Sequence, residues 1–114
     1  MNQFSLYSYY RSSCSYRVRI ALAHKNISYN YIPVHLVQNG GEQFSKAYSE
    51  INPKNEVPTL IHGKNSFSQS MAIFNYLDAV VPENLLFPSE KCKRAKVIEF
   101  CEIINSGIQP LQNL

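Results

Sequence analysis

The densest group of residues that could do chemistry is a run of hydroxyls and a thiol near the N-terminus. Residues 11–15 read Arg-Ser-Ser-Cys-Ser and precede a segment with helical spacing of apolar residues. The first turn of a helix has unpaired backbone N–H groups and a positive dipole end, so it stabilises a thiolate or carboxylate there. The same segment carries four basic residues and no acid: Arg11, Arg17, Arg19 and Lys25. These features favour an anionic ligand, although serine is also a preferred N-cap and the basic residues could be a solvated face.

Cys14 could itself be a nucleophile, because a helix N-terminus lowers the pKa of a thiol. Its spacing to Val18, Ala21 and Leu22 instead places it on the apolar, buried face of the predicted helix. Arg17 occupies the position of the second cysteine in a Cys-x-x-Cys motif, which excludes dithiol exchange. A monothiol redox reaction at Cys14 stays open.

Two later segments could complete a binding site. Val57 and Pro58 stand at the start of a predicted strand, where a proline leaves the backbone of the preceding residue free to pair with a peptide-like ligand. Gln69 and Ser70 open a predicted helix, with Ser70 as its expected N-cap and its N-terminus as a second anion site. Together the three segments suit a small anionic peptide.

The elements that must position these residues follow from the spacing of apolar side chains. The order β-α-β-α-β-β-α over about eighty residues predicts an α/β domain, a small mixed sheet covered by helices. Pro33 indicates that the second strand ends or lies at an edge of the sheet. The predicted elements are strands 4–8 and 29–34, a hairpin of 57–61 with 66–68, and helices 14–24, 43–49 and 70–81. The apolar face of the last helix is predicted at Ile73, Tyr76, Leu77 and Val80.

The remainder of the chain predicts a second part. A domain over residues 1–82 is followed by residues 83–114, which begin with a proline-containing linker and continue as a helix over 90–105. That helix carries apolar residues on several sides and needs partners, so we expect it to aggregate, swap or dimerise. We therefore expect a truncated gene product or a fragment of a longer chain whose helical second domain is absent.

Composition excludes several classes of protein. The chain has 114 residues, 45% of them hydrophobic, a composition that argues against disorder. A net charge of +3 falls short of the clustered charge of a nucleic-acid binder, and no apolar run is long enough for a membrane span. Cys14, Cys92 and Cys101 predict free thiols in a reducing, cytoplasmic setting. The cysteines and histidines lack the spacing of metal ligands, so no metal site is predicted.

These motifs resemble the zeta class of glutathione transferases, also called maleylacetoacetate isomerases. The resemblance covers essentially the whole chain, and its Ser-Ser-Cys-Ser motif is much more specific than a generic thioredoxin-like pattern. It implies a thioredoxin-like glutathione-transferase N-terminal domain, followed by one helix of an all-α C-terminal domain. The matching segments are residues 12–22, 40–44, 52–60, 69–73 and 107–114.

The resemblance also implies a role for individual residues. Ser12 would donate a hydrogen bond to the glutathione sulfur, with Ser13 and Cys14 beside it as further catalytic residues. Pro58 would be a cis-proline, and the backbone of Val57 would pair with the cysteinyl part of glutathione. The remaining residues implied to contact the ligand are Ser15, Tyr16, Arg17, Gln43, Gln69, Ser70, Gln109 and Asn113, of which Gln69 and Ser70 would hold the γ-glutamyl carboxylate.

The implied activity is glutathione-dependent cis-trans isomerisation. Glutathione thiolate would add to the cis double bond of maleylacetoacetate, and bond rotation with elimination would release fumarylacetoacetate. The thiol pKa near 8.5 would have to fall by about 2, which corresponds to roughly 2.7 kcal/mol of thiolate stabilisation. The implied partners are glutathione, a small carboxylate-bearing electrophile and a second copy of the chain, with impaired activity in this short chain. The alternatives are a transferase activity, or a non-catalytic module for glutathione binding or protein interaction.

Overall fold

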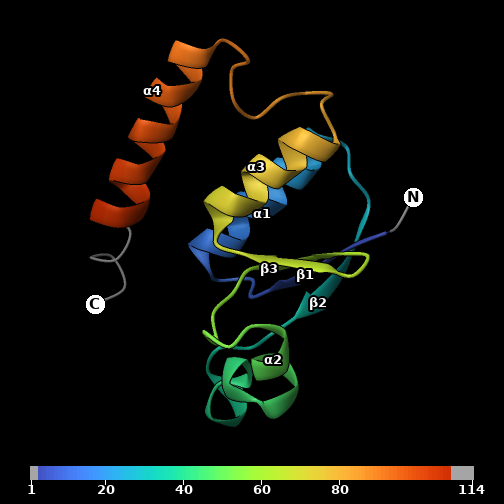
Figure 1. Cartoon of the computed structure of the whole chain (residues 1–114). Coiled ribbons are helices and arrows are strands. Elements are labelled where there is room, and N and C mark those ends of the chain that lie inside the picture. The colour runs from blue at the N-terminus through green and yellow to red at the C-terminus, as the bar shows by residue number, and fades with distance from the viewer. Residues whose placement is uncertain (1–2, 109–114) are drawn as a thin grey trace. The chain divides into compact units, whose positions relative to one another are not determined.

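The computed structural model describes residues 3–108, and the chain divides into two compact units, residues 1–84 and 85–114. The first unit contains a four-stranded sheet and three α-helices (Figure 1). The predicted α/β order is confirmed. Its elements are β1 (Phe4–Ser8), α1 (Ser13–His24), β2 (Tyr29–Pro33), α2 (Lys46–Ile51), β3 (Thr59–His62), β4 (Asn65–Ser68) and α3 (Ser70–Val80).

The sheet has the strand order β2-β1-β3-β4. β2 runs parallel to β1, whereas β3 is antiparallel to both β1 and β4. β2 is an edge strand, as Pro33 predicts, because a proline has no N–H to donate to a further strand. The hairpin of β3 and β4 is also confirmed, with its turn at Gly63 and Lys64.

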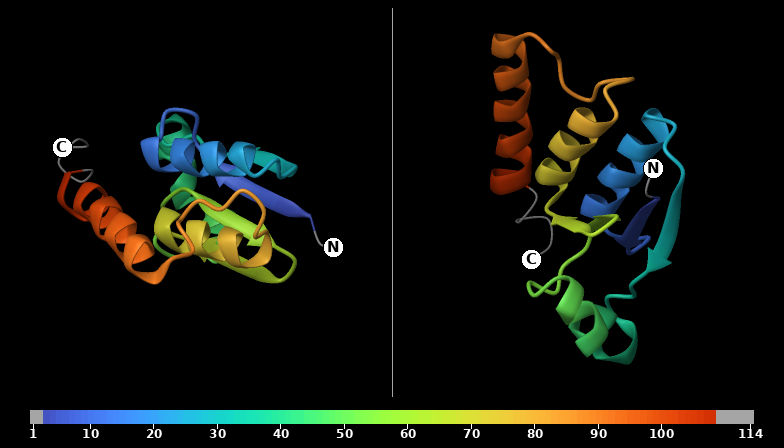
Figure 2. Two further views of the ribbon diagram at one scale, coloured as in Figure 1. Left: turned by 90° about the horizontal axis from the view of Figure 1, so that it is seen from above. Right: turned by 45° about the vertical axis from the view of Figure 1, so that its right-hand side comes forward.

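Helices α1 and α3 lie side by side on one face of this sheet, and α2 lies on the other face (Figures 1 and 2). The first face holds the core, because the side chains of β1 alternate and Phe4 and Leu6 point into it. Burial of each such large apolar side chain contributes about 1.5–3 kcal/mol. The completely buried apolar residues of this unit are Leu6, Val18, Leu22, Leu60, Ile73 and Leu77.

The buried face of α1 differs by one position from the prediction. Ser15, Val18, Ala21 and Leu22 are its buried residues, whereas Cys14 is half-buried. A shift of one residue turns a helical side chain by about 100°, so Ser15 takes the inward direction that spacing had assigned to Cys14. The expected buried-face position of Cys14 was therefore wrong.

Helix α3 begins as predicted at Ser70, but its N-cap is Gln69. Ser70 is the first helical residue and is itself buried, so the prediction that it caps the helix was wrong. Ile73 and Leu77 lie on the buried face as expected. Val80 is instead exposed, because the helix ends there at the surface of the unit.

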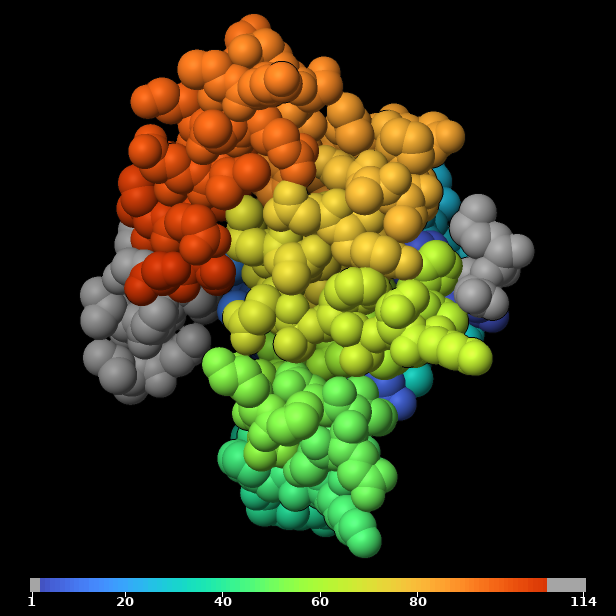
Figure 3. Space-filling model, viewed as in Figure 1, coloured from blue at the N-terminus to red at the C-terminus, as the bar shows by residue number. Residues whose placement is uncertain are grey.

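The segment between β2 and β3 was predicted least well. Two 3-10 turns, η1 (Gln38–Gly40) and η2 (Glu42–Phe44), precede α2, which covers Lys46–Ile51 rather than 43–49. Gly40 and Gly41 have positive φ angles, and a regular helix does not tolerate them. Ser45 then starts α2 as an N-cap, accepting a hydrogen bond from Tyr48 N–H at 3.2 Å. In the space-filling view this green segment projects from the rest of the first unit (Figure 3).

A buried ion pair joins the C-terminal ends of α1 and α3. Lys25 caps α1, and its Nζ lies 2.8 Å from Oδ1 of Asp78 in α3. The ammonium also donates to the carbonyl oxygens of Val81 at 2.7 Å and Glu83 at 3.2 Å. Three donors therefore have three acceptors, which makes burial of this cation tolerable.

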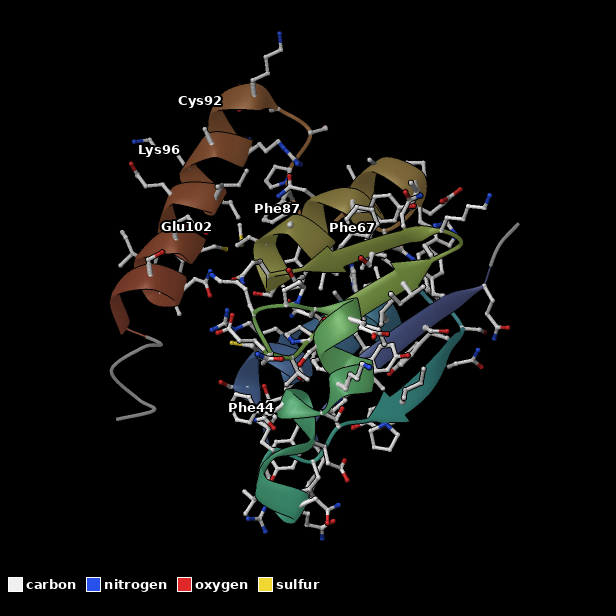
Figure 4. All side chains as sticks on the ribbon, turned by 60° about the horizontal axis from the view of Figure 1, so that its bottom comes forward. Phe44, Phe67, Phe87, Cys92, Lys96 and Glu102 are labelled. Atoms are coloured by element: carbon white, nitrogen blue, oxygen red, sulfur yellow. The ribbon has the colours of Figure 1, made fainter. Side chains whose placement is uncertain are left out.

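The second unit contains α4 (Lys91–Glu102), continued as a π-helix over Ile103–Ile108. Glu90 is the N-cap, and its carboxylate accepts hydrogen bonds from the N–H groups of Cys92 at 3.0 Å and Lys93 at 2.7 Å. These bonds lower the pKa of Glu90, that of Lys93 having the larger effect. No residue of α4 is buried, and Cys92, Lys96 and Glu102 project from it in Figure 4. No described helix is long and apolar enough to cross a membrane.

Candidate functional site

The register of the sheet gathers the predicted site segments at one end of it. Tyr7 in β1 pairs with Thr59 in β3, and Thr59 pairs with Ser68 in β4. β1 and β4 therefore end where β3 begins. The chain that follows β1 leads to Ser12, the chain before β3 contains Pro58, and Gln69 follows β4 directly. Ligands of α/β proteins commonly bind beyond such strand ends, where loops meet helix N-termini.

Ser12 is the N-cap of α1. Its Oγ accepts a hydrogen bond from Ser15 N–H at 3.1 Å, and its own N–H donates to the Tyr9 carbonyl at 3.0 Å. A serine hydroxyl is one donor and two acceptors, so the capping bond leaves the hydroxyl proton available. Ser12 is half-buried at this position, so a ligand can reach it. The capping role and the role of a hydrogen-bond donor to a ligand are thus compatible.

The other residues of the Ser-Ser-Cys-Ser motif have different surroundings. Ser13 is exposed in the first turn of α1, and Cys14 is half-buried as a free thiol. Ser15 is completely buried, and its Oγ accepts a hydrogen bond from Tyr9 N–H at 3.4 Å. Ser15 is therefore a structural contact to the loop between β1 and α1. Tyr16 is exposed on the surface of α1.

The Val57–Pro58 peptide bond is cis, as the family resemblance implies. Pro58 is buried and Val57 is half-buried. The structure gives the N–H and C=O of Val57 no hydrogen-bond partner within residues 3–108. Its backbone is thus able to pair with an extended peptide, which is the arrangement that the sequence predicted.

A buried polar network that the sequence did not indicate supports this loop. The Tyr48 hydroxyl donates to the carbonyl of Glu56 at 2.5 Å and lies 2.8 Å from Oγ1 of Thr59. Asn52 donates from Nδ2 to the same carbonyl at 2.9 Å. Burial raises the pKa of Tyr48, and its hydrogen bonds to Thr59 and Asn52 oppose that rise in part. Tyr48 and Asn52 thus hold the carbonyl of the residue immediately before Val57, and Thr59 bonds both of them.

The start of α3 has an unusual backbone. Gln69 has φ 71° and ψ 121°, a conformation that costs a non-glycine residue about 1–3 kcal/mol and that occurs most often at functional sites. No side chain caps this helix, so its first N–H groups remain open to an anion. The hydroxyl of the buried Ser70 accepts a long hydrogen bond, 3.4 Å, from Arg17 of α1. The structure thus brings together two predicted residues that are far apart in sequence.

The basic residues near the N-terminus do not form one surface. Arg17 lies at the predicted site, whereas the ammonium of Lys25 forms the ion pair with Asp78. Arg19 donates to Ser8 Oγ at 2.8 Å and so makes a structural contact. The guanidinium of Arg11 stacks over the ring of Tyr10 at 5.3 Å. The first turns of α1 and α3 contain no acid, so no carboxylate there opposes the positive ends of the two helix dipoles.

Gln43 has a less direct connection to the other predicted residues. It lies in η2, and its Oε1 is buried with no hydrogen-bond partner in the part of the chain that the structure describes. A ligand could reach this oxygen only after the side chain turns. Gln109 and Asn113 lie outside the described residues. The structure therefore groups Ser12, Arg17, Val57, Pro58, Gln69 and Ser70, but not the full predicted set.

One cavity of the first unit lies away from this group. It has a volume of about 540 Å³ and lies on the α2 face, between the sheet and the segment that carries Phe44, labelled in Figure 4. Its lining includes the tyrosines Tyr7 and Tyr48, whose ring centres are 5.5 Å apart. None of the predicted site residues lines it. Within residues 3–108 no group of three or more His, Cys, Asp or Glu side chains could hold a metal ion.

The sequence of this chain is similar to those of known proteins. Maleylacetoacetate isomerase of Dictyostelium discoideum is 50% identical over 113 residues, which are 99% of this chain and 52% of that protein. The zeta-class glutathione S-transferase of Euphorbia esula is 46% identical over 112 residues, 98% of this chain and 49% of that protein. The chain thus spans about half the length of the curated relatives it matches. These matches confirm the resemblance to the zeta class.

Solved structures agree with the sequence comparison. A holo structure of maleyl pyruvate isomerase, described as a bacterial zeta-class glutathione S-transferase, superimposes with a TM-score of 0.87 at 34% identity and covers 94% of this chain and 50% of that chain. A glutathione transferase homologue of Drosophila mojavensis with bound glutathione gives 0.84 at 30% identity, with coverage of 94% and 48%. The family model of the glutathione S-transferase N-terminal domain matches residues 2–79. The chain therefore belongs to the family of glutathione S-transferase N-terminal domains.

Proposed function

We propose that this chain binds glutathione beyond the strand ends of its sheet and stabilises the bound cosubstrate as a thiolate. The observation that carries the proposal is the grouping of a hydroxyl donor, an unpaired strand-like backbone and an uncapped helix start. Glutathione offers a thiol, peptide groups and carboxylates, and each has a chemical counterpart here. The homologous structure with bound glutathione supports the same ligand.

Each part of the site has a distinct task. The hydroxyl proton of Ser12 is directed to the glutathione sulfur, where it favours the anionic form of the thiol. The backbone N–H and C=O of Val57 pair with the cysteinyl part. The open N–H groups at the start of α3, together with Ser70, hold the γ-glutamyl carboxylate. Ser13 and Cys14 stand beside the thiolate, and Gln43 contacts the other end of the tripeptide.

The reaction class that we propose is cis-trans isomerisation of a small carboxylate-bearing electrophile, as in the maleylacetoacetate isomerases that the chain matches. Bound glutathione supplies a nucleophilic thiolate that is regenerated at the end of the reaction. The chain's own residues fix that sulfur, lower the thiol pKa and provide positive charge from Arg17. Glutathione transfer to another electrophile would use the same site. We further propose a cytoplasmic homodimer that acts in aromatic amino-acid breakdown.

The decisive experiment is a calorimetric titration of the chain with glutathione, combined with a pH titration of thiolate absorbance. Ser12→Ala should raise the pKa of bound glutathione back toward about 8.5. Ser45→Ala is a matched control, because Ser45 caps α2 with the same geometry on the other face of the sheet. Both substitutions remove one helix cap, but only the first should change the thiol pKa.

The outcomes separate the alternatives. Absence of glutathione binding by the unmodified chain would refute the proposal. Binding with a lowered thiol pKa but without isomerase turnover would indicate a glutathione-binding module. If Ser12→Ala leaves turnover unchanged and Cys14→Ser abolishes it, a monothiol reaction of Cys14 replaces the proposed mechanism.

A further inference from the structure

Arg19 holds the loop between β1 and α1 by three hydrogen bonds. Its Nη1 donates to Oγ of the completely buried Ser8 at 2.8 Å, and this is the shortest of the three. The same nitrogen lies 3.4 Å from the carbonyl oxygen of Tyr9, and Nη2 lies 3.3 Å from that of Tyr10. One guanidinium therefore contacts three consecutive residues that lead toward Ser12.

The Tyr9 carbonyl connects Arg19 directly to Ser12. It accepts the hydrogen bond of Ser12 N–H at 3.0 Å as well as the longer one from Arg19. A guanidinium bonded to a carbonyl oxygen fixes the direction of that oxygen, and the amide that shares it is fixed in turn. Ser12 and Arg19 thus share one carbonyl acceptor.

We propose that Arg19 is a positioning residue, which holds Ser12 so that its hydroxyl stays directed at the thiolate of the bound cosubstrate. The inference rests on the proposed function of Ser12. Arg19 itself lies in α1, and its guanidinium contacts the loop rather than the proposed ligand groups. Its effect is transmitted through the Tyr9 carbonyl.

The task requires a guanidinium rather than any positive charge. Arginine presents several N–H groups in a rigid plane, whereas a lysine ammonium is a compact charge on a flexible stem. The observed contacts use two separate nitrogens on acceptors of three residues. The Arg19 guanidinium also lies 5.3 Å from the ring centre of Tyr16, which restricts it further. A lysine ammonium at this position would lack the rigid plane that places two nitrogens on these acceptors.

The test compares Arg19→Gln, Arg19→Lys and Ile73→Val in the full chain. Ile73 is completely buried in α3, and its loss of a methylene lowers stability without touching the loop. Two quantities are measured for each variant. The first is the rate of amide hydrogen exchange at Ser12 without ligand, and the second is the thiol pKa of bound glutathione.

We expect Arg19→Gln to accelerate amide exchange at Ser12 about tenfold. This factor corresponds to a fall of about 1.4 kcal/mol in the free energy of local opening. The thiol pKa should rise toward its free value, with a much smaller change in glutathione affinity. Arg19→Lys should resemble Arg19→Gln in both measurements. Ile73→Val should change neither beyond its effect on global stability.

Two results would overturn the inference. One is unchanged exchange at Ser12 and an unchanged thiol pKa in a folded Arg19→Gln variant. The other is full recovery of both by Arg19→Lys, because the charge alone would then suffice. If the unmodified chain does not lower the thiol pKa, the proposed function itself fails, and exchange at Ser12 still decides whether Arg19 holds the loop.

Discussion

Helices α1 and α3 cover the same face of the sheet but begin in different ways. α1 starts with a side-chain cap, in which Ser12 accepts from Ser15 N–H. α3 starts at Gln69, which has a positive φ angle and provides no side-chain cap. One helix start thus presents a single directed hydroxyl, and the other presents open backbone N–H groups.

This difference corresponds to two kinds of anion. A thiolate carries its charge on one sulfur atom, so a single directed hydroxyl can donate to it. A carboxylate accepts several hydrogen bonds at once and suits the array of N–H groups at a helix start. The opposite ends of the two helices are joined by the ion pair of Lys25 and Asp78. One end of the helix pair thus carries a stabilising contact, and the other end carries the proposed ligand site.

The largest effect on stability is expected at the C-terminal ends of α1 and α3, which Lys25 and Asp78 join. Lys25→Met should lower the free energy of unfolding by about 3–5 kcal/mol, because it leaves the Asp78 carboxylate buried without its cation. The double variant Lys25→Met with Asp78→Leu should recover much of this loss. Chemical denaturation measures both. If the single variant also changes the thiol pKa of bound glutathione, the separation of the two helix ends is wrong.

The start of α1 should respond next in size. Ser12→Ala should cost about 1 kcal/mol of stability through the lost cap. Gln69→Ala removes no capping bond, so the corresponding change at the start of α3 should be smaller. Thermal unfolding of the two variants compares them directly. Equal losses would show that the two helix starts do not differ as described.

The start of α3 should gain stability from a glycine. Gln69→Gly relieves the positive φ angle and should add roughly 0.5–1 kcal/mol, after the greater flexibility of glycine in the unfolded chain is included. Glutathione affinity should fall at the same time, because the helix start loses its fixed shape. Calorimetry and thermal unfolding report the two effects. A simultaneous gain in affinity would contradict the functional reason for this conformation.

The smallest effect is expected at α4, whose cap is a carboxylate. The pKa of Glu90 is lowered, so its cap contributes stability above the pKa in the unfolded chain. That contribution is lost as the pH falls through the lowered value. Amide exchange at Lys93, corrected for intrinsic rates, should therefore increase on acidification. Exchange at Ser15, which is capped by a hydroxyl, provides the control.

Periodicity predicted the elements of the first unit well where local pattern and burial agree. β1 has the predicted bounds, and α3 starts at the predicted residue. Pro33 indicated that the second strand ends or lies at an edge, and β2 does both, because the effect of a proline is local to the backbone. The segment before α2 was missed because the glycine conformations and the cap at Ser45 decide it together.

The site was only partly predictable for a related reason. The hydroxyl run located the segment of residues 11–15, because capping preference and helix polarity are local properties, whereas the role of Ser12 came only from the family resemblance. The conformation of Gln69, the network of Tyr48, Asn52 and Thr59, and the contacts of Arg19 depend on residues distant in sequence. A glutamine carries no pattern that indicates a positive φ angle. These features arise only when the strands pair in register, so the sequence alone does not indicate them.

The enclosed ammonium of Lys25 has a consequence for protein chemistry. Its side chain has no solvent exposure, whereas the other lysines of the chain are exposed. An amine-reactive reagent should therefore modify the exposed lysines at once and reach Lys25 only when the first unit opens. The rate of labelling at Lys25 then measures the rate at which the first unit opens. Mass spectrometry of the chain, labelled in its native state, follows this rate.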